Sequence, residues 1–289
     1  MMMKRVRPWV SAVFVLAALT MAFSGCVPSD GGGCGTSSSS SSSTSTSSSG
    51  GGANAIESAY AATGPYATTS TSVSGYTIYY PRTMTSGHPI ITWGNGTGAP
   101  TLSYTGLLTH LASWGFVVMA SSSTMTQSGE EMIAGIDYLI QQNATAGSIF
   151  YGKLNTQLIG TTGHSQGGGG AINAAIDARV KCTAPIAPSP GQIGQVKCPI
   201  FLIAGSADTI VSASLVRSMS YALAKAPTIF GIASGMGHMD FLGNAGMARG
   251  YLTAWFMYQL RADARAAQAF TGSCEICNNP NWTVEKKNF

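Results

Sequence analysis

Residues 157–171 constrain the fold more than any other stretch of this 289-residue chain. The stretch begins with apolar, β-prone residues 158–162, which predict a short buried strand. It continues through Gly163-His164-Ser165-Gln166-Gly167, a match to G-x-S-x-G, into small residues that predict a helix. A strand that turns so sharply into a helix strains its central residue, and bulky neighbours two positions away would clash. The sequence therefore predicts a turn that exposes the Ser165 hydroxyl above a helix N-terminus, where backbone N–H groups stabilise negative charge.

The alternative is a glycine-rich turn with an incidental serine. Glycine makes up 36 of the 289 residues, so chance matches to the motif are expected. The strand before the motif and the small-residue helix after it are the context that a strained nucleophile turn requires. We therefore interpret Ser165 as a nucleophile.

Strand and helix patterns alternate from residue 90 to residue 260. Apolar runs predict strands at residues 76–81, 89–93, 115–120, 199–204 and 228–232, and helical spacing predicts helices at residues 101–114, 128–142, 212–224 and 245–267. Such alternation predicts parallel strands joined by right-handed helical crossovers. We predict an α/β fold, with a central, mostly parallel sheet and helices on both faces. Residues 54–74 are interpreted as a polar lead-in.

His238 is the histidine best placed to act as a base. Among the four histidines, His88 lies in a turn and His110 in a predicted helix. His164 lies inside the motif, where its side chain points away from that of the serine. His238 lies in a glycine-containing loop after the last predicted strand, and active sites of such sheets lie at the carboxyl ends of the strands. The alternative for His238 is a solvated loop histidine.

Asp208 is the acid predicted to orient that base. It follows the strand at residues 199–204, and it completes the chain order Ser, Asp, His expected of an α/β-hydrolase. Asp177, in the helix after the motif, is interpreted as a surface residue, and Asp240 as a candidate helix cap. Two backbone N–H groups must hold an oxyanion. We assign them to Gln166 and to the loop after residues 89–93, at Asn95, with Gly94 or Gly96 as alternatives.

The first 25 residues predict a signal peptide. Basic residues 4–7 precede an apolar run at 9–23, which is too short for a comfortable transmembrane helix. Ser24-Gly25-Cys26 resembles a bacterial lipoprotein cleavage site, at which Cys26 becomes the lipidated N-terminus, although Phe23 stands where leucine is usual. The alternative is ordinary cleavage with a free or disulfide-bonded Cys26. A lipid would anchor the protein to a membrane without spanning it.

Three parts follow from these patterns: a lipoprotein-type signal peptide at 1–25, a Ser/Gly-rich flexible tether at 26–53, and one catalytic domain at 54–289. Only 9% of residues are charged and the net charge is +4, without a basic patch that would indicate nucleic-acid binding. We expect no cofactor or metal, and a monomer located outside the cell or in its envelope.

The cysteine pattern agrees with export. Cys182 and Cys198 flank one predicted loop and could close it as a disulfide. Cys274-x-x-Cys277 is interpreted as a tight structural disulfide, with half of a metal site or a redox pair as alternatives. No second C-x-x-C or suitably spaced histidine supports zinc, and a thioredoxin-like context is absent. Cys34 is left over.

Several motifs together resemble bacterial cutinases and polyester (PET) hydrolases. They are Gly64-Pro65-Tyr66, Thr77-Ile78-Tyr79-Tyr80-Pro81, Gly115-Phe116-Val117-Val118, Gly135-Ile136-Asp137-Tyr138-Leu139 and the Gly163–Gly170 stretch, in the family's order and spacing. The resemblance implies a lidless α/β-hydrolase with a shallow cleft that hydrolyses esters, including polyesters. It also implies a triad of Ser165, Asp208 and His238, with Asn95 and Gln166 at the oxyanion positions.

The chain departs from the family at two positions. Gln166 stands where methionine is usual, and Ser189 stands where an aromatic residue, often tryptophan, follows Ala-Pro. One wall of a clamp for aromatic rings is therefore missing, and Trp93 at the end of its strand is a candidate substitute. We name Trp93, Gly94 and Ser189 as candidate substrate-binding residues.

The sequence thus predicts an exported serine ester hydrolase of cutinase or polyesterase type, acting on ester or polyester substrates. One alternative is an esterase for small soluble or acylated-sugar esters. The other is a non-catalytic surface lipoprotein that uses the fold for binding.

Overall fold

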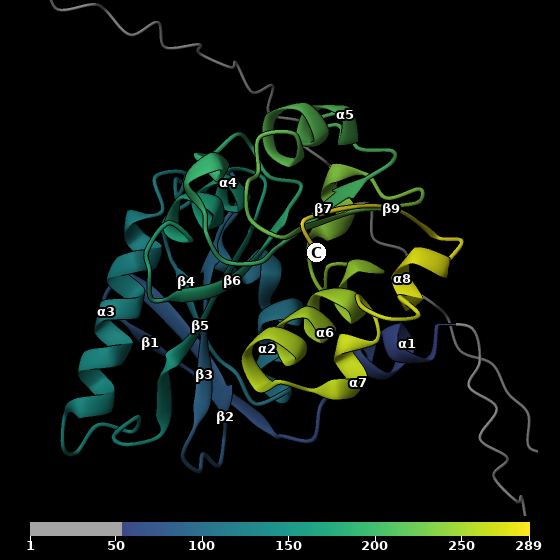
Figure 1. The fold of residues 1–289 in the computed structure, drawn as a ribbon. Helices are drawn as coiled ribbons and strands as arrows, with labels where there is room; N and C mark the ends of the chain where they lie inside the picture. Colours follow the sequence, from purple (N-terminus) through teal and green to yellow (C-terminus); the bar gives the residue numbers. More distant parts are fainter. Residues whose placement is uncertain (1–53) are drawn as a thin grey trace, which may run out of the picture. The chain divides into compact units, whose positions relative to one another are not determined.

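The computed structural model describes residues 54–289, which form one mixed α/β unit (Figure 1). The predicted signal peptide, the lipidation candidate Cys26 and the tether lie outside the described residues. The strands are β1 (Thr68–Val73), β2 (Tyr76–Pro81), β3 (His88–Gly94), β4 (Val117–Ser121), β5 (Leu154–His164), β6 (Val180–Ile186), β7 (Ile200–Gly205), β8 (Thr228–Ala233) and β9 (Trp282–Lys287).

The helices lie between these strands and at both ends of the described chain. They are α1 (Ala55–Ala61), α2 (Thr105–Ser113), α3 (Glu130–Ala144), α4 (Gln166–Ala174), α5 (Ala213–Val216), α6 (Ala248–Arg261), α7 (Ala264–Ala267) and α8 (Glu275–Asn278). Short helical turns η1 (Thr101–Tyr104), η2 (Ile193–Gln195), η3 (Arg217–Tyr221) and η4 (His238–Phe241) occupy connecting segments.

All nine strands join one sheet in the order β1-β2-β4-β3-β5-β6-β7-β8-β9. The strands from β3 to β8 run parallel, whereas β1, β2 and β9 pair antiparallel at the two ends of the sheet. Helices α2 and α6 cover one face, and α3, α4 and α5 cover the other (Figure 1). The predicted α/β fold with a mostly parallel sheet and helices on both faces is confirmed.

The central strands are continuous apolar runs because both of their faces are covered by helices. Every residue of β3, β4, β7 and β8 is buried. The predicted polar lead-in at 54–74 is wrong, because this segment folds into α1 and the edge strand β1. Strand β1 reads Thr-Thr-Ser-Thr-Ser-Val and is only partly buried, so it shows no apolar pattern.

The closing helix predicted at 245–267 is two helices. Ala262 adopts a left-handed conformation (φ 52°) that ends α6, and the Asp263 carboxylate then accepts hydrogen bonds from the amides of Arg265 and Ala266. An aspartate at this position caps a new helix start, so the break is encoded locally.

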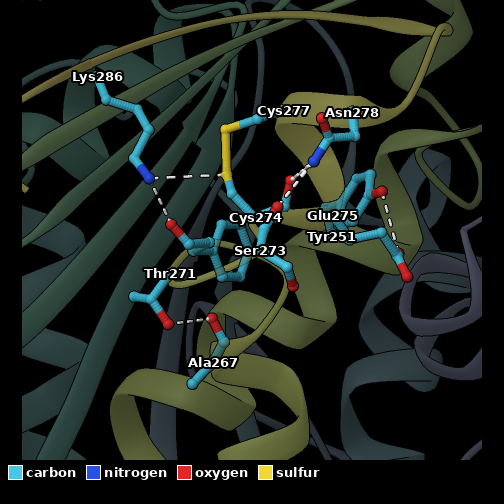
Figure 2. Close-up of a disulfide and its surroundings, with 10 residues drawn as sticks. Tyr251, Ala267, Thr271, Ser273, Cys274, Glu275, Cys277, Asn278 and Lys286 are labelled. Carbon is cyan, nitrogen blue, oxygen red and sulfur yellow. Dashed lines mark hydrogen bonds between the residues drawn. A yellow bond between two sulfur atoms is a disulfide. The ribbon is translucent and has the colours of Figure 1, made fainter.

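Cys274 and Cys277 form a disulfide at the start of α8, as predicted (Figure 2). The predicted bond between Cys182 and Cys198 is wrong, because both thiols are free. Cys182 is buried within β6, while the Cys198 sulfur, two residues before β7, lies 4.0 Å from the Ala175 carbonyl oxygen. Within residues 54–289, no helix is long and apolar enough to cross a membrane.

Candidate active site

Ser165 lies in a strained turn between β5 and α4. Its backbone has φ 58° and ψ −120°, a conformation that non-glycine residues rarely adopt. The Ser165 amide donates to the Ile186 carbonyl of the neighbouring strand at 2.9 Å, which holds the turn in place. A Cβ atom on Gly163 would overlap the backbone of Gly167 across the turn, and one on Gly167 would overlap the backbone of Gly94 at the end of β3. The glycines of G-x-S-x-G are therefore required sterically.

His238 and Asp208 form a hydrogen-bonded pair at the carboxyl end of the sheet. His238 Nδ1 lies 2.7 Å from Asp208 Oδ2, and the two side chains are 7% and 0% exposed. The other carboxylate oxygen accepts the amides of Ile210 and Val211, each at 2.8 Å. These bonds fix the carboxylate, so it can hold the imidazole with its Nε2 side free.

The strained turn at Ser165 lies next to the Asp208–His238 pair, and His164 makes the contact between them. The ring centroids of His164 and His238 are 4.5 Å apart, with an interplanar angle of 40°. Since His164 directly precedes Ser165, His238 lies beside the Ser165 turn. Among residues 54–289, no hydrogen bond joins the Ser165 hydroxyl to His238. Catalytic hydrogen bonds are often long without substrate and tighten in the complex.

Burial keeps His164 neutral. Desolvation lowers the pKa of His164 to about 3, and the nearby His238 ring adds to this effect. The Tyr104 hydroxyl lies 3.0 Å from His164 Nδ1. His164 is therefore a buried, uncharged ring that packs against the ring of His238.

The candidate oxyanion amides belong to Asn95 and Gln166. The Gly96 amide is occupied, since it donates to the Tyr104 hydroxyl at 3.2 Å. No acceptor is assigned to the amides of Asn95 and Gln166 within the described chain, and Gln166 begins α4, where the first amides have no intrahelical partner. The Gln166 side chain turns aside and accepts the Thr126 amide at 2.8 Å.

The Asn95 side chain fastens its loop. Its Oδ1 accepts the Trp93 indole N–H at 2.9 Å, and its Nδ2 donates to the Ser121 and Ser123 carbonyls at 2.6 and 2.9 Å. Asn95 is fully buried. These contacts fix the backbone around the Asn95 amide, so sequence reasoning selected the residue but missed its side-chain role.

Of the three candidate substrate-binding residues, two are buried in the structure and one is partly buried. Trp93 is fully buried and packs 4.8 Å from the Tyr104 ring, which contradicts its assignment to substrate binding. The reason is that β3 is central, so both of its faces are covered. Gly94 is likewise buried, against the backbone of Gly167. The Ser189 hydroxyl, partly buried, donates to Gln127 Oε1 at 2.5 Å.

Sequence reasoning missed four exposed apolar side chains in the loops after β3, β4, β7 and β8. They are Leu102, Met125, Ile210 and Met239, which are 61% to 80% exposed and which we call the apolar rim. Ile210 and Met239 closely follow Asp208 and His238, and the Met125 sulfur lies 3.3 Å from Gln166 Nε2. A large apolar residue beside a predicted catalytic residue was the available signal. No group of three or more metal-ligating side chains occurs in the described part.

Comparisons with known proteins identify the family of the chain. A family model described as PET hydrolase-like matches residues 42–287. A bis(hydroxyethyl) terephthalate hydrolase from Streptomyces coelicolor is 33% identical over 171 residues, 53% of each chain. Cutinase 2 of Thermobifida cellulosilytica is 33% identical over 147 residues, which are 47% of this chain and 53% of the relative. Cutinase cut1 of Thermobifida fusca is equally similar, over 47% of this chain and 44% of its own.

The chain thus spans about half the length of these curated relatives, whereas the family match extends over most of the chain. The resemblance predicted from the motifs is confirmed. This chain belongs to the PET hydrolase-like family.

Proposed function

We propose that the protein is a serine ester hydrolase of cutinase or polyesterase type, with a lidless α/β-hydrolase domain. The observation that carries the proposal is the buried Asp208–His238 pair, whose ring lies against the residue preceding a strained, partly exposed Ser165. A serine hydroxyl is a weak nucleophile until an oriented base takes its proton. The family membership supports the same chemistry.

In the proposed mechanism, Ser165 Oγ attacks the ester carbonyl while His238 Nε2 takes its proton. Asp208 holds the opposite ring nitrogen and stabilises the imidazolium that forms. The amides of Asn95 and Gln166 bind the oxyanion of the tetrahedral intermediate. His238 then protonates the leaving alcohol, and water hydrolyses the acyl-enzyme with the same histidine as base. No cofactor takes part.

The apolar rim favours esters with apolar acyl or alcohol parts, including polyesters such as PET. Exposed apolar side chains in the loops that carry Asp208 and His238, together with Met125 in contact with Gln166, offer a surface to apolar ligands. Small soluble or acylated-sugar esters are a second candidate, because Ser189 replaces the aromatic residue usual in the family and is bonded to Gln127. Without that ring, the site offers less surface for stacking a terephthalate unit.

Product release from p-nitrophenyl esters of increasing acyl length, acylated sugars, and PET and aliphatic polyester films tests both candidates. We expect a fluorophosphonate probe to label Ser165, and Ser165→Ala to lower ester hydrolysis by about 10⁴-fold or more. Activity on soluble esters alone would favour the second candidate. A folded wild type with no labelling and no hydrolysis would refute the enzyme proposal and favour a non-catalytic surface protein.

We further propose export as a monomeric lipoprotein, with a signal peptide, a lipid on Cys26 and a flexible tether. The basic and apolar pattern of residues 4–23 and the Ser-Gly-Cys sequence at its end support this. Metabolic labelling with an alkynyl fatty acid should mark the wild type and not Cys26→Ser. Equal labelling of the two would refute the anchor.

A further inference from the structure

Two buried hydrogen bonds and one ring contact form a chain that joins the two halves of the proposed active site, and the mechanism above does not use it. At one end, the Gly96 amide lies in the loop that also carries the Asn95 amide. Gly96 N donates to the Tyr104 hydroxyl at 3.2 Å, and that oxygen lies 3.0 Å from His164 Nδ1. At the other end, the His164 ring lies 4.5 Å from the ring of His238. Tyr104 therefore contacts both the oxyanion loop and the ring beneath the base.

The proton positions along this chain follow from hydrogen-bond accounting. The Tyr104 oxygen accepts from Gly96 N–H, so its own O–H needs an acceptor, and His164 Nδ1 is the group in reach. A proton on Nε2 leaves that one buried nitrogen without a partner among the described residues, whereas the opposite assignment, with Nδ1–H donating, would leave both Nε2 and the phenol O–H unpaired, which is more costly. His164 then carries its proton on Nε2, and its lone pair on Nδ1 is occupied.

This state of His164 matters for the neighbouring base. When His238 takes the serine proton it becomes an imidazolium. A second positive ring 4.5 Å away would oppose that charge, whereas a neutral ring with its lone pair already engaged does not. The hydroxyl thus keeps the ring beneath the base neutral and fixed while it anchors the loop of the Asn95 amide.

We propose that the Tyr104 hydroxyl is a positioning group that sets the oxyanion loop and the base in register, through Gly96 on one side and His164 on the other. The inference rests on the proposed function, since that function assigns the loop and the base their roles. Tyr104 touches no substrate. Its ring packs against Trp93, so the hydroxyl is the part that distinguishes positioning from core filling.

Tyr104→Phe tests this, with Tyr79→Phe as the matched control. Tyr79 is also a buried tyrosine, and its hydroxyl bonds to Thr105 Oγ1 at 3.3 Å, outside the catalytic group. With a soluble p-nitrophenyl ester, we expect Tyr104→Phe to lower kcat by about 10- to 100-fold, because a small misplacement of catalytic groups costs that much. KM should change less than about twofold, since uniform binding is untouched. Tyr79→Phe should leave both constants unchanged.

Histidine side-chain ¹⁵N NMR supplies a readout independent of turnover. In the wild type, the His164 Nδ1 signal should be that of an unprotonated, hydrogen-bonded nitrogen, with the proton on Nε2. In Tyr104→Phe the two His164 signals should move toward a mixture of tautomers, while Tyr79→Phe retains the wild-type signals. A wild-type His164 protonated at Nδ1, or an unchanged kcat in Tyr104→Phe, would overturn the proposal.

Different results would contradict the ester-hydrolase function and the positioning role of Tyr104. Failure of the function proposal would appear as a wild type that neither reacts with a fluorophosphonate nor hydrolyses esters, and the positioning role would fall with it. An active, labelled wild type with an equally active Tyr104→Phe would overturn the positioning role alone.

Discussion

Two carboxylates in this protein, those of Asp208 and Glu275, each accept two backbone amides but serve different purposes. Asp208 accepts the amides of two successive residues at 2.8 Å each, and Glu275 accepts the amides of Ile56 and Glu57 in the first turn of α1 at the same distance. Asp208 does so with one oxygen and keeps the other for a histidine ring 2.7 Å away. Glu275 commits both oxygens to α1. Asp208 therefore differs from Glu275 in having one carboxylate oxygen that does not bind backbone amides. This free oxygen, more than burial or the amide contacts, distinguishes a candidate catalytic acid from a structural one.

Glu275 belongs to a cluster that ties the two ends of the described chain together. Its Oε1 also accepts the Tyr251 hydroxyl at 3.2 Å (Figure 2), and Glu57 accepts Asn279 and Trp282 at 2.8 and 3.2 Å. We call Glu57, Tyr251, Glu275, Asn279 and Trp282 the glutamate cluster. Glu275 lies between Cys274 and Cys277, so their disulfide closes the backbone turn that carries this carboxylate.

The largest expected effect comes from Asp208→Asn. An asparagine oxygen can still accept the Ile210 and Val211 amides, but the amide group no longer holds His238 in the required tautomer. We expect kcat for ester hydrolysis to fall by about 10⁴-fold, with the free energy of unfolding changed by less than about 1.5 kcal/mol. Ester kinetics and urea unfolding check the two halves of this statement. Retained activity would place Asp208 on the structural side of the comparison.

Glu275→Ala should give the opposite pattern. It removes two charge-assisted hydrogen bonds to α1, so we expect the free energy of unfolding to fall by about 3 kcal/mol while kcat/KM stays at the wild-type value. Glu285→Ala is the control, because Glu285 pairs with Arg217 at the surface, and exposed ion pairs contribute at most about 1 kcal/mol. If the two variants lose equal stability, or if Glu275→Ala impairs catalysis, the structural role of Glu275 is contradicted.

The smallest effect is a pH dependence within the glutamate cluster. Desolvation raises the pKa of Glu57 above the ordinary value of 4.5, against the lowering effect of its bonds to Trp282 and Asn279, and the nearby Glu275 raises it further. A raised folded-state pKa contributes stability that is complete below pH 4.5 and is lost as the pH rises through the folded value.

The measurable consequence is a changing difference between the wild type and Glu57→Gln. From chemical unfolding at several values between pH 4 and about pH 7, we expect the wild type to lose stability relative to Glu57→Gln as the pH rises. Taking the difference removes the titration of other groups. A difference independent of pH would show that Glu57 has the same pKa in the folded and unfolded states.

The sequence predicted those parts of the fold in which local pattern and tertiary environment agree. The Ser165 turn and the buried central strands other than β6, which was not among the predicted strands, are of this kind, since apolar runs and the context around the paired glycines point to the same structure. Edge strands β1 and β9 were missed because they are only partly buried and rich in threonine, serine, lysine or glutamate. Residues at sheet edges carry polar side chains that guard against aggregation, and that hides them from pattern recognition.

The candidate site shows the same division. Chain order and strand ends selected Asp208 and His238, which are 30 positions apart in the sequence and which the structure brings into contact. Trp93 was misassigned because a strand-end position does not tell which neighbours cover it. The Tyr104–His164 bond spans 60 positions and depends on how η1 packs against β5, which no local pattern encodes.

The glycine run in α4 bears on how this protein can be engineered. Replacing helical glycines with alanine is a common route to higher thermal tolerance. Here a methyl on Gly167 would overlap the Gly94 carbonyl, and one on Gly170 would overlap the Thr126 carbonyl. Libraries built for heat resistance should leave this helix intact. Gly194 is a better place to begin, because the nearest atom to an added methyl there is the Leu223 carbonyl oxygen, at 3.5 Å.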